Sequence, residues 1–260
     1  DASAAVTELK QQGADFIKVY NRVPRDAYFT LAATAKALDI PFAGHVPSSV
    51  TAQEASAAGQ KSVEHLFNLL LACSSREDKL MHMKAQALAS DDSGERSALR
   101  QSYLQSILHS YDAEKAKALF ALFAKNGTWQ TPTLVQRRAF AFTPAKTPED
   151  PRMRFIPKSQ RWRWDPQQDG RIQGRSAERQ DIERQFYEKD RALIAPMRAA
   201  GVGFLAGTDT PDGFAFPGFS LHEELAQLVD AGLSPMEALQ SATSNPAKYF
   251  GLSDAGFIAE

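Results

Sequence analysis

The chain has 260 residues, of which 43% are hydrophobic and 23% charged, a composition typical of a soluble globular protein with one large core. Its formal net charge of -1 argues against partners such as nucleic acid or an anionic membrane surface. The single cysteine excludes an intrachain disulfide framework, and no apolar run approaches the ~20 residues that cross a bilayer. These features leave the compartment open between the cytoplasm and an exported or periplasmic location.

The first 70 residues alternate between helical patterns and short apolar runs. The runs 15–20, 42–47 and 62–67 predict strands, and the stretches 26–38 and 51–58 between them predict helices. One strand, one helix and two loops occupy about the spacing at which these runs recur, so the strands are expected to be parallel neighbours.

The rest of the chain continues this alternation with two long interruptions. Strands are predicted at 128–135 and 202–208, which gives five readable strands in total. The stretches 68–126 and 136–200 are interpreted as excursions of helices and loops within a single partial catalytic domain, 1–260. We therefore expect an α/β fold of the barrel type that is incomplete.

Three sequences of the capping-box type mark further helix starts. In this motif a Ser or Thr and a Glu three positions later satisfy each other's backbone N–H groups. The pattern predicts helices that begin after Thr51, Ser220 and Ser234.

Four ionisable residues lie at or near the ends of four predicted strands: Lys18, His45, His65 and Asp209. Because the carboxyl ends of parallel strands meet at one rim of a barrel, we expect these side chains to converge. Two imidazoles and a carboxylate are good ligands for a divalent metal such as zinc.

The motifs around these residues carry a family resemblance. Lys18 in Ile-Lys-Val-Tyr, His45 in Gly-His-Val-Pro, His65 in Val-Glu-His-Leu and Asp209 in Gly-Thr-Asp-Thr resemble metal-site motifs of the amidohydrolase superfamily. More narrowly, they are similar to its imidazolonepropionase-related and Xaa-Pro dipeptidase-like branch. The segment Ala-Thr-Ser-Asn-Pro-Ala near the C-terminus is also similar to that branch.

The resemblance implies a TIM (β/α)8 barrel with two metal ions, most readily zinc. Lys18 would react with carbon dioxide to form a carbamate that bridges the metals, and His45 and His65 would hold the second metal. Asp209 would bind the first metal and act as the catalytic base. Tyr20 would hydrogen-bond a substrate carboxylate, and His222 would reach the same pocket.

The implied activity is hydrolysis of an amide bond in a small molecule, a dipeptide or an N-acyl amino acid. A lactonase or organophosphate hydrolase is the alternative on the same metal centre. The family's first motif, His-x-His, does not occur in this sequence, and neither does its small β-sandwich. We therefore expect strands four to eight of a barrel that begins upstream, and a catalytically silent fragment is a further alternative. Unpaired edges of such a fragment predict self-association.

Overall fold

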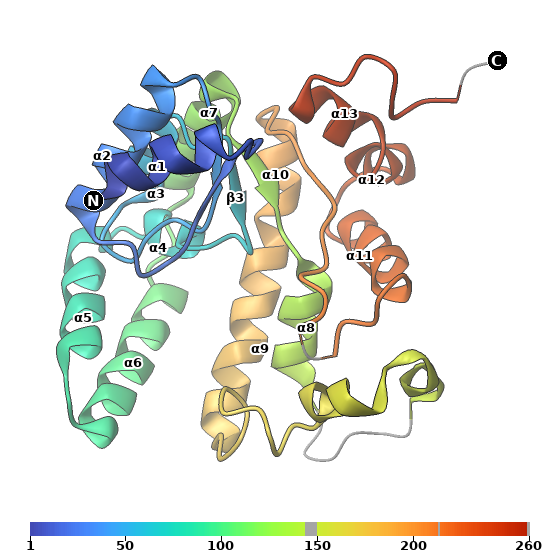
Figure 1. The fold of residues 1–260 in the computed structure, drawn as a ribbon. Coiled ribbons are helices and arrows are strands. Elements are labelled where there is room, and N and C mark those ends of the chain that lie inside the picture. The colour runs from blue at the N-terminus through green and yellow to red at the C-terminus, as the bar shows by residue number, and fades with distance from the viewer. Residues whose placement is uncertain (144–149, 213, 259–260) are drawn as a thin grey trace. The chain divides into compact units, whose positions relative to one another are not determined.

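The computed structural model describes residues 1–143, 150–212 and 214–258 (Figure 1). They divide into two compact units. Unit 1 contains residues 1–132 and 196–204, and unit 2 contains residues 133–195 and 205–260. The excursion predicted at 136–200 lies partly outside the described residues.

Unit 1 is built around a parallel sheet whose strands follow one another in chain order. The strands are β1 (Ile17–Val19), β2 (Phe42–Gly44), β3 (Ser62–Glu64) and β4 (Trp129–Thr131). Parallel strands are short apolar runs because both faces of such a sheet are covered. The α/β class and the parallel sheet predicted from the sequence are confirmed. All four carboxyl ends therefore lie at one edge of this sheet.

The fifth expected strand, 202–208, is reduced to one parallel bridge between Phe204 and Gln130 among the described residues. The Gln130 N–H donates to the Gly203 carbonyl, 2.9 Å away. A Cβ atom at Gly203 would lie 2.4 Å from the Trp129 ring, so only glycine allows this close approach.

The fourth strand is shorter than the predicted 128–135. Pro132 lacks the N–H that would continue the ladder, and Thr133 has a left-handed backbone with φ 48°. A helix, α8 (Leu134–Phe142), then begins where the sequence pattern predicted the end of a strand.

Helices cover the sheet and extend unit 1. The helices beside the first three strands are α1 (Ala2–Gln11), α2 (Arg25–Ala37) and α3 (Ala52–Ala57). Between β3 and β4 lie α4 (Leu69–Ala72), α5 (Glu77–Ala89), α6 (Ser93–Leu108) and α7 (Ala113–Asn126). Helices α5 and α6 form a packed hairpin joined by residues 90–92 (Figure 1). The capping box predicted at Thr51 is confirmed at the start of α3.

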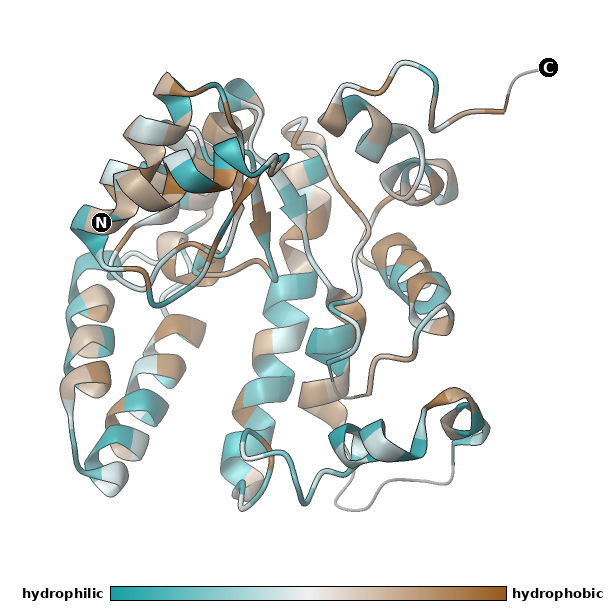
Figure 2. Ribbon diagram, in the orientation of Figure 1, coloured by the Kyte–Doolittle hydropathy of each residue, from teal (hydrophilic) through white to brown (hydrophobic). Residues whose placement is uncertain are grey.

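Unit 2 is mainly helical in its described part. It contains α8, the 3-10 helices η1 (Pro151–Phe155) and η2 (Lys158–Trp164), α9 (Ala177–Ala192), α11 (Phe219–Asp230), α12 (Pro235–Ser241) and α13 (Ser244–Phe250). The boundary between the units falls within α10 (Ile194–Ala199). Helix α8 packs against α9 and α11. Helix α9 is mostly hydrophilic, and its buried residues include Ile182 and Phe186 (Figure 2).

The capping box predicted at Ser234 is confirmed, whereas the one at Ser220 is wrong. Helix α11 begins two residues earlier, after Gly218, whose φ of 79° suits glycine. The Ser220 hydroxyl instead accepts the Phe216 N–H at 2.8 Å and donates to Glu223 at 2.9 Å.

None of the helices in the described ranges combines the length and the apolar character that a membrane span requires.

Candidate metal centre

Three strand ends of unit 1 bring polar side chains together. Lys18 is the central residue of β1, His45 follows β2 directly, and Glu64 and His65 lie at the end of β3. Backbone hydrogen bonds extend the ladder to these positions: the His45 N–H donates to Val19 at 3.0 Å, and the His65 N–H donates to Thr131 at 2.9 Å. The side chains are therefore anchored on the rigid edge of the sheet.

Two unusual backbone positions allow this convergence. Gly44 has φ 126°, and a Cβ atom there would lie 2.3 Å from the Val19 carbonyl oxygen, so β2 can approach β1 only with glycine. His65 has φ 56°, in the left-handed region. In a continuous strand Glu64 and His65 would point to opposite faces of the sheet. The turn at His65 brings both side chains to the same place.

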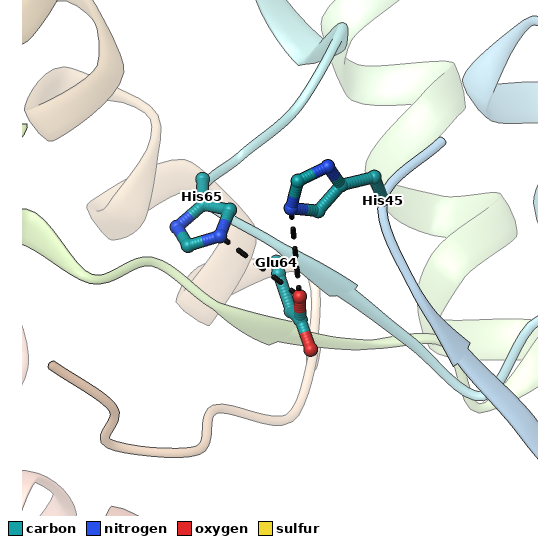
Figure 3. Close-up of side chains that lie close together, drawn as sticks. All are labelled: His45, Glu64 and His65. Atoms are coloured by element: carbon teal, nitrogen blue, oxygen red, sulfur yellow. Dashed lines mark ion pairs between the residues drawn. The ribbon is translucent and has the colours of Figure 1, made fainter. Parts of the chain in front are cut away.

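The carboxylate of Glu64 lies at the middle of the group (Figure 3). Its Oε2 atom is 3.7 Å from His45 Nε2 and 3.9 Å from His65 Nε2. Lys18 Nζ donates a hydrogen bond to the same oxygen. The two imidazole rings meet edge to face, with centroids 4.9 Å apart at 78°. This arrangement directs both Nε2 atoms towards one carboxylate.

The surroundings of His45 favour its neutral imidazole. His45 is buried, and this burial lowers its pKa; Glu64 opposes the shift and Lys18 adds to it. The His45 ring stacks on Tyr20, with centroids 4.5 Å apart, and on Phe67, with centroids 4.9 Å apart. Its Nδ1 atom is buried and has no hydrogen-bond partner within the described residues. Ring stacking, not a hydrogen bond at Nδ1, therefore holds the orientation of this imidazole.

The donor set fits one divalent cation. One ligand atom from each of His45, Glu64 and His65 lies within 4.8 Å of the others. Zinc binds imidazole nitrogen and carboxylate oxygen at about 2.0 to 2.2 Å, so a small inward movement of these side chains would complete three bonds. Lys18 is paired with Glu64 and is the member of the group with no lone pair in its protonated form.

Glu64 is the member of this group that sequence reasoning missed. Its neighbour His65 is the ligand predicted from the sequence, and Glu64 is only part of the motif around it. The signal available in the sequence was its position beside a candidate ligand at a strand end. Without the left-handed turn at His65, strand alternation places the two side chains apart.

Asp209 and His222, the other predicted site residues, belong to unit 2. Asp209 has φ 55°, and its Oδ2 atom accepts a hydrogen bond from Gln136 Nε2 at 2.9 Å. The same amide donates to Asp212 at 2.9 Å, and Arg171 also binds Asp212 through two hydrogen bonds. His222 is an exposed residue in the first turn of α11. The structure thus brings Lys18, His45 and His65 together within unit 1 and places Asp209 in a separate hydrogen-bonded cluster of unit 2.

Comparison with known proteins assigns the chain to a family. The sequence model of the amidohydrolase family matches residues 21–260. The chain belongs to the amidohydrolase family. This membership agrees with the motifs around Lys18, His45, His65 and Asp209. No curated protein sequence matches the chain.

Several solved structures have a similar fold. A bottromycin amidohydrolase has a TM-score of 0.72 and 23% sequence identity, and the match covers 98% of this chain and 51% of that one. A Xaa-Pro dipeptidase with methionine bound in its active site has a TM-score of 0.56 and 16% identity, covering 100% of this chain and 49% of that one. An uncharacterized protein has a TM-score of 0.57 and 19% sequence identity, and the match covers 99% of this chain and 49% of that one. This chain therefore spans about half the length of these three structures.

Proposed function

We propose that the protein containing this chain is a metal-dependent hydrolase that cleaves the amide bond of a dipeptide or an N-acyl amino acid. The observation that carries the proposal is the convergence of His45, Glu64 and His65 at the carboxyl edge of the sheet. Membership of the amidohydrolase family supports the same reaction class. Two similar structures, named an amidohydrolase and a dipeptidase, are consistent with an amide substrate.

The residues of unit 1 would hold the metal and orient it. His45 and His65 supply nitrogen donors, and Glu64 supplies an oxygen donor from the same edge. A bound divalent cation lowers the pKa of water and polarises a carbonyl group. Lys18 is expected from the family resemblance to carry a carbamate. The negative charge of the carbamate would replace the ammonium group that donates a hydrogen bond to Glu64 in this structure. Tyr20 lies on the His45 ring and is 60% exposed, so its hydroxyl is open to a substrate.

Asp209 is proposed as the base, on the strength of the family motif. A carboxylate with a free lone pair accepts a proton from water as the water oxygen bonds to the carbonyl carbon. The carbon–nitrogen bond then breaks, and the proton passes from Asp209 to the leaving amine. The products are one carboxylic acid and one amine, so the reaction consumes one water molecule. His222 remains a proposed substrate contact, since it is exposed at the start of α11.

The proposal is tested by metal content and a substrate panel. The purified protein is expected to bind zinc after reconstitution and to hydrolyse dipeptides or N-acyl amino acids in preference to lactones and organophosphate esters. The variant His65→Ala should lose both metal and activity because one of three donors is removed. The matched control His82→Ala changes an exposed histidine of α5 and should retain both.

Two results would contradict this assignment. Absence of bound metal after zinc reconstitution would leave a silent scaffold. Hydrolysis of lactones or phosphate esters, with no turnover of amides, would assign the alternative chemistry to the same centre.

A further inference from the structure

A lysine from the long segment between β3 and β4 reaches the edge of the sheet that carries the metal centre. Lys84 of α5 donates a hydrogen bond from Nζ to Asn68 Oδ1 at 2.7 Å. The Asn68 amide group in turn donates to the carbonyls of Val46 and Pro47, both at 3.3 Å. Since Val46 and Pro47 directly follow His45, Lys84 lies on the same edge of the sheet as the histidines.

An aromatic ring connects this lysine to a proposed metal ligand. Lys84 Nζ lies 5.7 Å from the centroid of the Phe67 ring. The same ring stacks on His45, with centroids 4.9 Å apart and an angle of 10° between the planes. Lys84 and His45 therefore share one aromatic neighbour, which places the ammonium on the side of the metal centre where Phe67 lies.

No carboxylate among the described residues pairs with the Lys84 ammonium. Its polar partner within the described residues is the neutral Asn68 amide, and it forms no ion pair there. Burial lowers the pKa of Lys84 to about 8. Lys115, by contrast, lies 2.8 Å from the Glu77 carboxylate. A partly buried cation without a counter-ion carries a desolvation cost that an anionic ligand removes.

We propose that Lys84 binds the carboxylate of the substrate, so that the protein selects amides with a free carboxylate next to the scissile bond. This inference rests on the proposed hydrolase function and assigns to Lys84 the preference for N-acyl amino acids and dipeptides over neutral amides. It also gives a role to helix α5, in a segment that shows no sequence motif. Tyr20 is the residue expected from the sequence to bind the substrate carboxylate. Tyr20 and Phe67 each stack on the His45 ring, so variants of Tyr20 and of Lys84 can test the two candidate carboxylate contacts one at a time.

The test compares N-acetyl amino acids with their C-terminal amides, which differ in the negative charge. Lys84→Met should raise KM for the acids about 10- to 100-fold, the usual effect of one charged hydrogen bond, with kcat retained. KM for the amides should change little, and Lys84→Arg should restore part of the preference. Lys79→Met, at an exposed position of the same helix, is the matched control.

Several outcomes would overturn the role of Lys84. The first is a Lys84→Met protein whose KM rises equally for the acids and the amides, and the second is one whose preference for the acids is unchanged. The third is a loss of the preference for acids in Tyr20→Phe while Lys84→Met retains that preference. If the wild-type protein hydrolyses neither substrate, the proposed function fails separately. Equilibrium binding of the N-acetyl amino acids by calorimetry then decides the inference, because the wild-type protein should bind them about 10- to 100-fold more tightly than Lys84→Met. Equal binding by Lys84→Met, or no binding by the wild-type protein, would refute it.

Discussion

Two glutamates, one in each unit, show how surroundings decide what a carboxylate does. Glu64 ends a strand in unit 1, its side chain is 21% exposed, and it contacts one ammonium and two imidazoles. Glu224 of α11 is 0% exposed. It accepts the Val135 N–H at the start of α8 at 2.7 Å, and its Oε1 atom has no partner within the described residues. One carboxylate faces cations at an accessible edge, and the other caps a helix in an apolar interior.

The number of charged neighbours distinguishes Glu64, a candidate metal ligand, from Glu224, a carboxyl group with a structural role. Burial raises the pKa of Glu224 to about 7, and the N–H groups of α8 only partly oppose the shift. A carboxyl group that holds its proton near neutral pH is a poor metal ligand. Glu64, by contrast, lies beside the Lys18 ammonium and the two imidazoles.

The largest effect is expected for Glu224→Gln and is a change in stability with pH. The folded protein keeps the Glu224 proton up to about pH 7, whereas the unfolded chain releases it near 4.5. The free energy of unfolding of the wild-type protein therefore falls as the pH rises from 4.5 to 7, by about 3 kcal/mol in total. The neutral glutamine removes this loss. Urea unfolding should show equal stability of the two proteins at pH 4.5 and a more stable variant at pH 8.

The matched control for this prediction is Glu188→Gln, a change at an exposed glutamate of α9 paired with Arg191. It should leave the stability difference between pH 4.5 and pH 8 unaltered. A Glu224→Gln protein that is less stable than wild type at both pH values would show that the charged form is required at the start of α8.

A smaller effect is expected for Glu64→Gln, measured as metal affinity. The amide removes the negative charge at the middle of the centre and leaves Lys18 without its partner. Zinc or cobalt binding by calorimetry should weaken about 10- to 100-fold, the range seen when groups that support a metal site are changed. Glu77→Gln, which also removes a lysine-paired carboxylate in unit 1, should leave the affinity unchanged. Equal affinity in Glu64→Gln would exclude Glu64 from the centre.

The smallest effect is expected for Gln136→Leu, which sharpens the comparison within unit 2. Gln136 follows Val135, the residue held by Glu224, and its amide binds both Asp209 and Asp212 at 2.9 Å. Loss of these hydrogen bonds should lower kcat about 10-fold with KM nearly constant, and should speed hydrogen exchange over residues 207–212. Gln185→Leu, which removes a surface glutamine–aspartate bond in α9, is the control. Unchanged exchange would show that Gln136 does not hold Asp209.

Much of unit 1 was predictable because its signals are local. Apolar runs recurred with the βα period, and the first three strands appear within them, although shorter. The capping boxes at Thr51 and Ser234 were read correctly because both partners lie within four residues. At Ser220 the same pattern failed because Gly218 starts the helix and the serine hydroxyl binds Phe216 instead. A nearby glycine with a positive φ outweighed the motif.

The site was only partly predictable because its shape depends on backbone turns. Lys18, His45 and His65 were predicted from their places in or after apolar runs, and the structure brings these three side chains together. Glu64 was missed since nothing in the sequence marks His65 as left-handed. Lys84 was not singled out either, because its relation to His45 runs through Phe67 and Asn68 and not through a motif. Long-range packing of an inserted helix leaves no periodic signal.

The left-handed turn at His65 also limits which donor atoms this position can supply. Asn, Asp and His are the side chains with donor atoms that adopt such a backbone most readily, whereas β-branched residues strain it. Replacing the imidazole by Asp or Asn thus exchanges a nitrogen for a harder oxygen donor with the chain path kept. Oxygen-rich sites prefer manganese or magnesium over zinc. A single backbone angle therefore makes residue 65 the natural place to redesign the ion preference of the centre.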